Sequence, residues 1–213
     1  MKRQDLLDSA EQLFAKSGYG KTQISEIARV AKTGISTFYR YFESKEALLS
    51  TLVAELFDPL AETLRERRSG IEELSPPELV ARIRETFELA FDALLARPRL
   101  TQILFSSGFG ASPVVSNSVR RELDAFAGDL GMVFDHTQRL GLVEIPDTTA
   151  FARGIIGVIL HLAHDHITTG SPDRETAIDV STRMTIGGLM TYATAETQPG
   201  MAQMLALLLG RSQ

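Results

Sequence analysis

The sequence predicts an all-α protein made of a small N-terminal three-helix domain and a longer helical body. Apolar residues recur at helical spacing along most of the chain, no segment alternates convincingly as a strand, and no Asn-Gly hairpin turn occurs. Of the 213 residues, 44% are hydrophobic and 23% are charged, so neither a disordered chain nor a fibrous repeat is favoured. We expect about nine to ten helices in all.

The first four helices follow from apolar stripes and from residues that start or stop a helix. Leu6, Ala10 and Phe14 lie on one stripe of a first helix, which Gly18 ends. Two short helices come next, and a fourth, longer helix carries Pro59 in its interior. The expected helices cover residues 3–17, 23–31, 34–42 and about 44–68.

Most of the later helices are expected to start after a small polar residue. Ser75, Ser112 and Ser171 each precede a proline and are expected to act as N-caps, as is Asp147. Gly141 is expected to end a helix. These signals predict helices over residues 76–96, 98–108, 113–140, 147–169, 173–196 and 199–211.

Composition and charge exclude several classes of protein and of functional site. The chain has no Cys, which excludes a disulfide scaffold, a zinc–thiolate site and thiol catalysis. No secretory signal or membrane-spanning run is visible, so we expect a cytoplasmic protein that does not bind membranes. Residues 1–50 carry a net charge of +2 and the remainder −7, which suggests that the N-terminal domain meets an anionic partner.

The N-terminal region also contains a recognisable motif. Two short helices joined by a tight turn, after a longer helix, are the ingredients of a helix-turn-helix. The segments LFAKSGY at 13–19, TQISEIA at 22–28 and TFYRYFESKEAL at 37–48 resemble the DNA-binding domain of the TetR family of bacterial transcriptional regulators. The resemblance covers about residues 3–50, and the remainder matches the family only in length and helical plan.

The third helix is expected to read DNA. On a helical wheel Phe38 and Phe42 share one face and are expected to be buried, so the opposite polar face turns outward and can enter the major groove. Arg40 is expected to reach guanine, and the tyrosine hydroxyls and Lys45 to contact phosphates. With the resemblance, the expected DNA-binding residues are Gln23, Ser25, Lys32, Thr33, Ser36, Thr37, Tyr39, Arg40, Tyr41 and Lys45.

Two residues depart from the family pattern. Lys32 and Ser36 stand where the family commonly has glycine. Lys32 must therefore avoid a left-handed backbone or tolerate its cost of about 1–2 kcal/mol. Ser36 changes the surface that the recognition helix presents, so the operator of a relative cannot be transferred to this chain.

The body is expected to form a dimer, because two recognition helices about 34–36 Å apart are needed to read successive major grooves. Small residues line one face of each of two late helices, and the family places its interface in its last helices. The alternative is that these residues pack within one subunit. The candidate interface residues are Gly154, Gly157, Val158, His161, Asp165, Ser181, Thr185, Gly188 and Tyr192.

The resemblance also implies an effector pocket in the body. Aromatic pairs at helical spacing are candidates for its lining, with plain core packing as the alternative, and residues 105–111 are a candidate pocket edge or hinge. A largely apolar pocket suits a small hydrophobic effector. The candidate residues are Phe87, Phe91, Phe105, Phe109 and His161.

Together these patterns indicate a ligand-responsive, dimeric DNA-binding regulator, expected to repress a palindromic operator. Residues 1–50 would form the DNA-binding domain and residues 51–213 the effector-binding and dimerisation domain. No cofactor, metal or enzymatic activity is expected. The alternative is a helical sensor or small-molecule enzyme without DNA binding that uses the segment His161–His166, although catalytic motifs such as G-x-S-x-G and H-E-x-x-H are missing.

Overall fold

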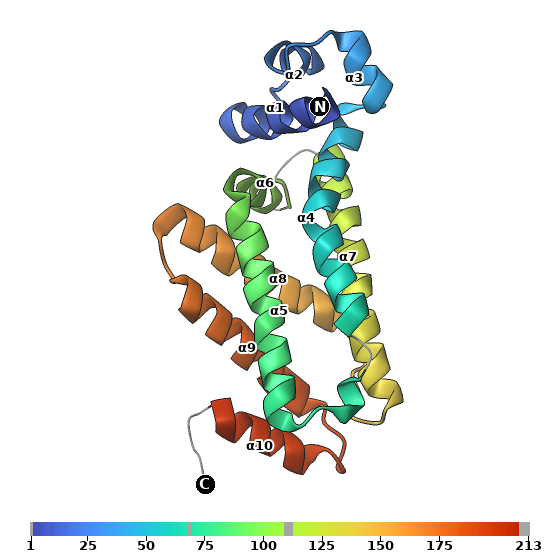
Figure 1. Ribbon diagram of the computed structural model, residues 1–213, viewed down its shortest axis with the longest axis vertical. Coiled ribbons are helices and arrows are strands. Elements are labelled where there is room, and N and C mark those ends of the chain that lie inside the picture. The colour runs from blue at the N-terminus through green and yellow to red at the C-terminus, as the bar shows by residue number, and fades with distance from the viewer. Residues whose placement is uncertain (1, 68–69, 109–112, 209–213) are drawn as a thin grey trace.

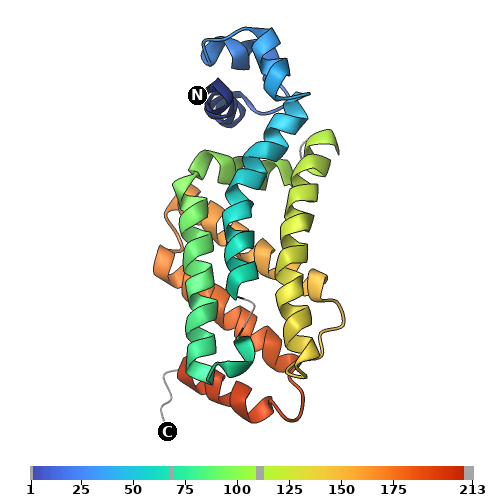
Figure 2. The same cartoon turned by 45° about the vertical axis from the view of Figure 1, so that its right-hand side comes forward.

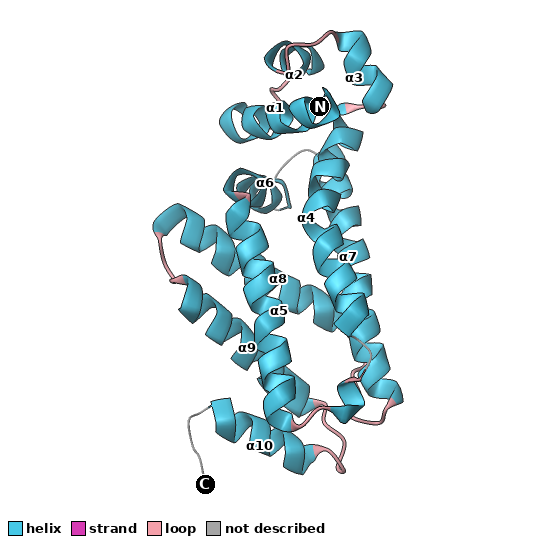
Figure 3. Ribbon diagram, viewed as in Figure 1, coloured by secondary structure: helices cyan, strands magenta, loops and turns pink. Residues whose placement is uncertain are grey.

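The computed structural model describes residues 2–67, 70–108 and 113–208, and the regular structure of these residues is helical (Figure 3). The predicted all-α class is confirmed. The helices of the N-terminal part are α1 (Lys2–Ser17), α2 (Ile24–Val30), α3 (Ile35–Tyr41) and α4 (Lys45–Arg67). The later elements are the short 3-10 helix η1 (Ile71–Glu73), α5 (Pro76–Ala96), α6 (Pro98–Gly108), α7 (Pro113–Arg139), α8 (Thr148–Thr169), α9 (Arg174–Thr191) and α10 (Gln198–Leu208).

Two of the later helices begin at carboxylate caps. Asp147 and Asp173 each accept a hydrogen bond of 2.8 Å from the backbone N–H three residues further on. The prediction that Asp147 is an N-cap is confirmed. The prediction that Ser171 is an N-cap is wrong, because Asp173, two residues later, is the N-cap of α9. Ser75 is the N-cap of α5, as predicted, and Ser112 lies outside the described residues.

One predicted helix is shorter in the structure. The helix expected over residues 173–196 ends at Thr191, and Ala193 then forms an isolated antiparallel bridge with the loop after α7. The hydroxyls of Thr194 and Thr197 donate to carbonyls of the same loop at 2.9 and 2.7 Å. These bonds hold the backbone in a non-helical path, which the apolar spacing alone does not reveal.

The helices form an elongated molecule (Figure 1). Helices α1–α3, here called the head, lie at one end and α10 lies at the other. Helix α4 leaves the head and runs beside α7 through the body, while α8 and α9 pack against α5 (Figures 1 and 2). The expected domain boundary at residue 50 therefore lies inside α4.

A continuous apolar core joins head and body. Leu6 and Phe38 in the head, Leu52 in α4 and Phe91 in α5 are all fully buried members of it. Such a core makes α4 a packed connection, so the head does not hang on a loose linker. In the described ranges, no helix has the length and apolarity that a bilayer crossing requires.

Candidate nucleic-acid interface and effector cavity

The position of α3 is fixed by two buried rings. Phe38 is 0% and Phe42 4% exposed, and they join Phe14 and Ile27 in the core of the head. Burial of two phenylalanines stabilises this docking by about 1.5–3 kcal/mol each. Because both rings point inward, the other face of α3 is turned to solvent, as the sequence predicts.

The outward face of α3 carries the polar side chains that DNA recognition requires. Ser36 and Arg40 are exposed, Thr37 is half-buried, and Tyr39 and Tyr41 are 55% and 41% exposed. Arg40 lies over the Tyr41 ring, 5.0 Å from its centroid, so the guanidinium must turn away from this ring to reach a base. Hydroxyls and one guanidinium on a protruding helix match the acceptors of the major groove and the phosphates beside it.

The remaining head candidates lie at the two ends of α2. Gln23 and Ser25 are exposed at its start. At its end Lys32 has φ of 50°, the left-handed backbone that the family glycine would adopt without strain. In the turn before α3, Lys32 is exposed and Thr33 is half-buried. The side chains of Gln23, Ser25, Lys32 and Thr33 are thus at least partly accessible on the surface of the head.

The expectation for Lys45 needs correction. Its ammonium donates to the carbonyl oxygens of Tyr19 and Thr22, both at 2.8 Å, and lies 4.2 Å from the centre of the Tyr19 ring. Burial lowers the pKa of Lys45, partly offset by the charge of neighbouring Glu46. Lys45 therefore connects the loop between α1 and α2 to the start of α4 and is not a free phosphate ligand. The spacing of side chains in the sequence could not predict this role, because the partners of Lys45 are backbone carbonyls.

The body contains a cavity of about 350 Å³ between α4, α5, α7, α8 and α9, to whose lining η1 and the segment before α10 also contribute. This volume falls in the range of small-molecule sites. Its walls are mainly apolar. Among the lining residues are Leu64, Leu79, Ile83, Phe87, Leu130, Val133, Ile155, Ile159 and Leu189.

Most of the predicted effector residues do not line this cavity. Phe87 does, but Phe91 is buried in the core against His166, and Phe105 stacks on His164 with ring centres 3.8 Å apart. The side chain of His161 is 60% exposed and outside the cavity, and Phe109 and most of the predicted 105–111 edge lie outside the described residues. Phe91, Phe105 and His161 therefore do not belong to the wall of this cavity, and their role in ligand binding stays a prediction.

The candidate dimer residues divide between two faces. On α8, Gly154, Gly157 and His161 are exposed, Val158 and Asp165 are half-buried, and both glycines have open space beside them. On α9, Ser181 and Thr185 are buried inside the subunit. Gly188 faces Phe151, whose ring a Cβ would meet at 3.0 Å, and the Tyr192 ring also packs on Phe151.

Ser181 and Thr185 are therefore packed within the subunit and are not on its surface, whereas the half-buried Gly188 and Tyr192 stay a prediction as interface residues. The outward face of α9 instead presents Met184, which is 57% exposed, and Gly187, which has open space beside it. A helical wheel separates these residues from the buried set, but the sequence does not say which face turns inward.

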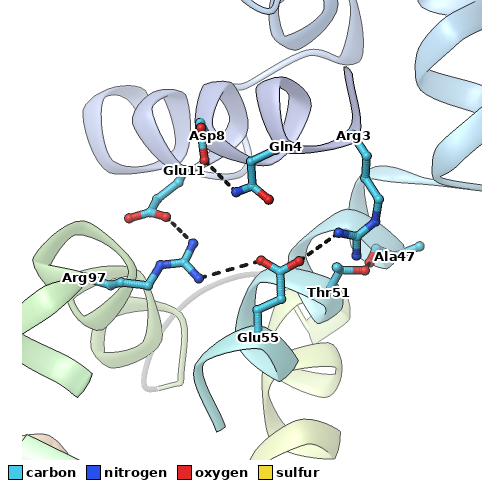
Figure 4. A network of polar contacts seen from close by, with 8 residues as sticks. All are labelled: Arg3, Gln4, Asp8, Glu11, Ala47, Thr51, Glu55 and Arg97. Atoms are coloured by element: carbon cyan, nitrogen blue, oxygen red, sulfur yellow. Dashed lines mark hydrogen bonds and ion pairs between the residues drawn. The ribbon is translucent and has the colours of Figure 1, made fainter. Parts of the chain in front are cut away.

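Ion pairs connect the head with the body at the junction of α5 and α6 (Figure 4). Arg97 bonds Glu11 of α1 at 2.5 Å and lies 3.9 Å from Glu55 of α4, whose other oxygen accepts a bond of 2.9 Å from Arg3. These four residues are called the head–body network. In the part of the chain that is described, no three His, Asp or Glu side chains gather closely enough to hold a metal ion.

Comparison with known proteins agrees with this arrangement. A family model described as "Bacterial regulatory proteins, tetR family" matches residues 6–52. The HTH-type transcriptional regulator YdgC of Bacillus subtilis is 29% identical over 176 residues, which cover 80% of this chain and 84% of that protein. The transcriptional activator FasR of Mycolicibacterium smegmatis is 23% identical over 189 residues, which cover 88% and 83%.

A similar fold is present among solved structures. The fatty acid degradation regulator FadR from Bacillus halodurans matches with a TM-score of 0.67 at 20% identity, over 88% of this chain and 96% of that chain. At this identity the match shows that the two chains share the fold of head and body.

Proposed function

Since this chain belongs to the TetR family of helix-turn-helix transcriptional regulators, we propose that it binds a palindromic operator as a homodimer and represses transcription until a small apolar effector enters its body. The observation that carries the proposal is the outward polar face of α3, which the buried rings of Phe38 and Phe42 turn to solvent. Repression follows from occupancy, because a dimer seated over a promoter excludes polymerase without further chemistry.

Selection of bound duplexes from a random DNA pool tests the DNA-binding part of the proposal. The expected result is a two-fold symmetric consensus whose half-sites are about 10 base pairs apart, or a multiple of one helical turn. Absence of any enriched duplex would favour the alternative of a sensor without DNA binding. The sign of regulation is tested separately by transcription in vitro from a promoter that carries the consensus, where repression is expected.

The dimer is proposed to form through the outer faces of α8 and α9. Gly154, Gly157 and the half-buried Gly187 have open space beside them, and Met184 is exposed on α9. Small residues let helices of two subunits approach closely, and an exposed methionine supplies apolar contact. Sedimentation at micromolar concentration should give a dimer for the natural chain and a monomer for Gly157→Arg; a dimer that survives this variant would place the interface elsewhere.

The effector is proposed to occupy the apolar cavity and to act on the head through α5. The first half of α5 lines the cavity with Leu79, Ile83 and Phe87, and Arg97, at the C-cap of the same helix, contacts Glu11 in the head. A helix transmits displacement over its length with little loss, and a change in operator affinity by the effector needs about 1–3 kcal/mol of coupling. A ligand that raises the melting temperature and weakens operator binding would support this step.

A further inference from the structure

One residue of the cavity wall does not fit an entirely apolar ligand. The stripe of α5 that faces the cavity is Leu79, Arg82, Ile83, Thr86, Phe87 and Ala90. Arg82 thus places a guanidinium in the middle of a row of apolar and small side chains. The side chain is half-buried, and burying a cation without an opposite charge is unfavourable.

The other charged residues that line the cavity are already matched or solvated. Arg67 pairs with Glu85 at 3.2 Å, Glu72 lies 3.6 Å from the His136 ring nitrogen, and Glu196 is exposed to solvent. Arg67 is half-buried like Arg82, but unlike Arg82 it has a carboxylate partner within ion-pair distance.

Among the described residues, the side chain of Arg82 donates one hydrogen bond, from Nη1 to the carbonyl oxygen of Arg67 at 3.2 Å. Among the described residues no carboxylate lies within 4.0 Å of its guanidinium. Glu78, one turn earlier, is hydrogen-bonded to the N-cap Ser75, and the charge of Arg82 is the smallest of the causes that lower the pKa of Glu78. Several N–H groups of Arg82 therefore remain available to an acceptor inside the cavity.

We infer that Arg82 recognises the anionic head of the effector, so that the ligand is an amphipathic carboxylate with its tail among the apolar walls. This inference rests on the proposed function of the cavity as an effector site. A planar carboxylate matches the guanidinium fork with two parallel hydrogen bonds, and the apolar surroundings strengthen them. The competing explanation is that Arg82 only extends its head into water.

Calorimetric titration of the full-length protein with dodecanoate and dodecanol separates the two explanations, because these probes share a tail and differ in charge. The natural chain should bind dodecanoate at least about tenfold more tightly than dodecanol. Arg82→Gln should remove this preference and leave the affinity for dodecanol unchanged, and Arg82→Lys should keep part of it. The control Arg120→Gln changes the net charge equally at a 79% exposed side chain and should bind like the natural chain.

Equal affinity for the two probes, or an unchanged preference in Arg82→Gln, would overturn the inference. Should Arg82→Gln not fold, the comparison of probes on the natural chain and Arg82→Lys still decides. Binding of dodecanol without a preference for dodecanoate leaves the proposed effector site standing and removes only the role of Arg82. If neither probe binds, the inference and the apolar effector site fail together, whereas the selected DNA consensus is unaffected.

Discussion

Lys32 shows how one residue can oppose the local geometry that its motif requires. Its φ of 50° is the left-handed conformation, which costs an L-residue with a Cβ about 1–2 kcal/mol and glycine almost nothing. The turn nevertheless forms, because the N–H of Thr33 bonds the Ala28 carbonyl at 2.9 Å and the flanking helices are buried on each other. The strain at this turn is therefore offset by the packing of the head.

Replacing Lys32 with glycine should stabilise the protein. The expected gain in the free energy of unfolding is about 1 kcal/mol, since relief of strain exceeds the entropy that glycine adds to the unfolded chain. Urea unfolding measures the change. Ser36→Gly serves as the matched control at the second family glycine position, because it lies inside α3 and should destabilise by about 0.5–1 kcal/mol. A less stable Lys32→Gly variant would mean that the lysine side chain contributes more than its backbone costs.

Tyr19 and Glu46 form the most perturbed titrating pair of the head. The Tyr19 hydroxyl donates to the Glu46 carboxylate at 2.7 Å. Burial and this bond raise the pKa of Tyr19 far above its ordinary value, whereas the bond lowers the pKa of Glu46 below its ordinary value of 4.5. A carboxyl group whose pKa is lower in the folded protein than in the unfolded chain stabilises the fold at pH values above its ordinary pKa. This contribution is lost as the pH falls through the pKa of the group in the folded protein.

Tyr19→Phe should therefore lower stability in a pH-dependent way. At pH 7 the loss should be about 1 kcal/mol, a value reduced by solvent screening of the partly exposed carboxylate. The difference from the natural chain should begin to shrink as the pH falls below 4.5, where Glu46 of the unfolded chain becomes protonated, and should be lost once the pH passes the lower pKa of Glu46 in the folded protein. Thermal unfolding between neutral and acid pH measures it. Tyr39→Phe, at a 55% exposed ring, is the control and should lie on the natural curve at every pH.

At the scale of the element, the proposed function divides the outward residues of α3 into those expected to position the protein on DNA and those expected to read its sequence. Tyr39→Phe removes one hydroxyl expected at a phosphate and should weaken binding to the selected operator and to unrelated duplex by the same factor, about fivefold. Arg40→Ala should cost about 1–3 kcal/mol on the operator and little on unrelated DNA, so that base preference relaxes. Fluorescence anisotropy at fixed salt measures both. Equal losses on both duplexes for Arg40→Ala would assign Arg40 to a phosphate.

The features of the structure that the sequence predicts differ from one helix to another. Local periodicity and caps predict nearly all helices, and the spacing of Phe38 and Phe42 predicts which face of α3 is outward, because both features are encoded within one turn or two. The faces of α9 are not predicted in this way. Ser181 and Thr182 bond the carbonyls one turn back at 2.8 and 2.7 Å, so small polar residues fit an interior as well as a dimer interface.

The cavity is a property of the whole molecule and could not be read from any single pattern. Its walls come from helices far apart in sequence, and their mutual rotation decides that Phe87 faces the cavity while Phe91, one turn later, is buried in the core. The aromatic spacing on α5 indicates a buried face correctly. It does not distinguish a core position from a lining position, because that depends on α7 and α8.

The proposed coupling between effector binding and DNA binding also depends on the arrangement of the whole molecule. Arg82 and Arg97 are separated by roughly 22 Å of helix, and α5 therefore places the cavity wall and the head–body network on one rigid element. Glu11 and Arg97 are 15% and 24% exposed, so their ion pair is less screened than a surface pair and fixes α1 relative to the end of α5. A shift of α5 on effector binding would move Glu11, and with it the head.

Replacing Arg97 with alanine should therefore uncouple the two sites while leaving each intact. Effector affinity should stay within about twofold of the natural value, whereas the effector's reduction of operator affinity, about tenfold or more in the natural chain, should fall towards none. Operator titrations with and without effector measure this difference. Arg174→Ala is the control: it breaks a bidentate pair with Asp92, also on α5, at 2.7 Å. Among the described residues, Arg174 has no hydrogen bond or ion pair to the head, so its loss should preserve coupling. Full coupling in Arg97→Ala would show that the signal reaches the head through α4 and its apolar core instead.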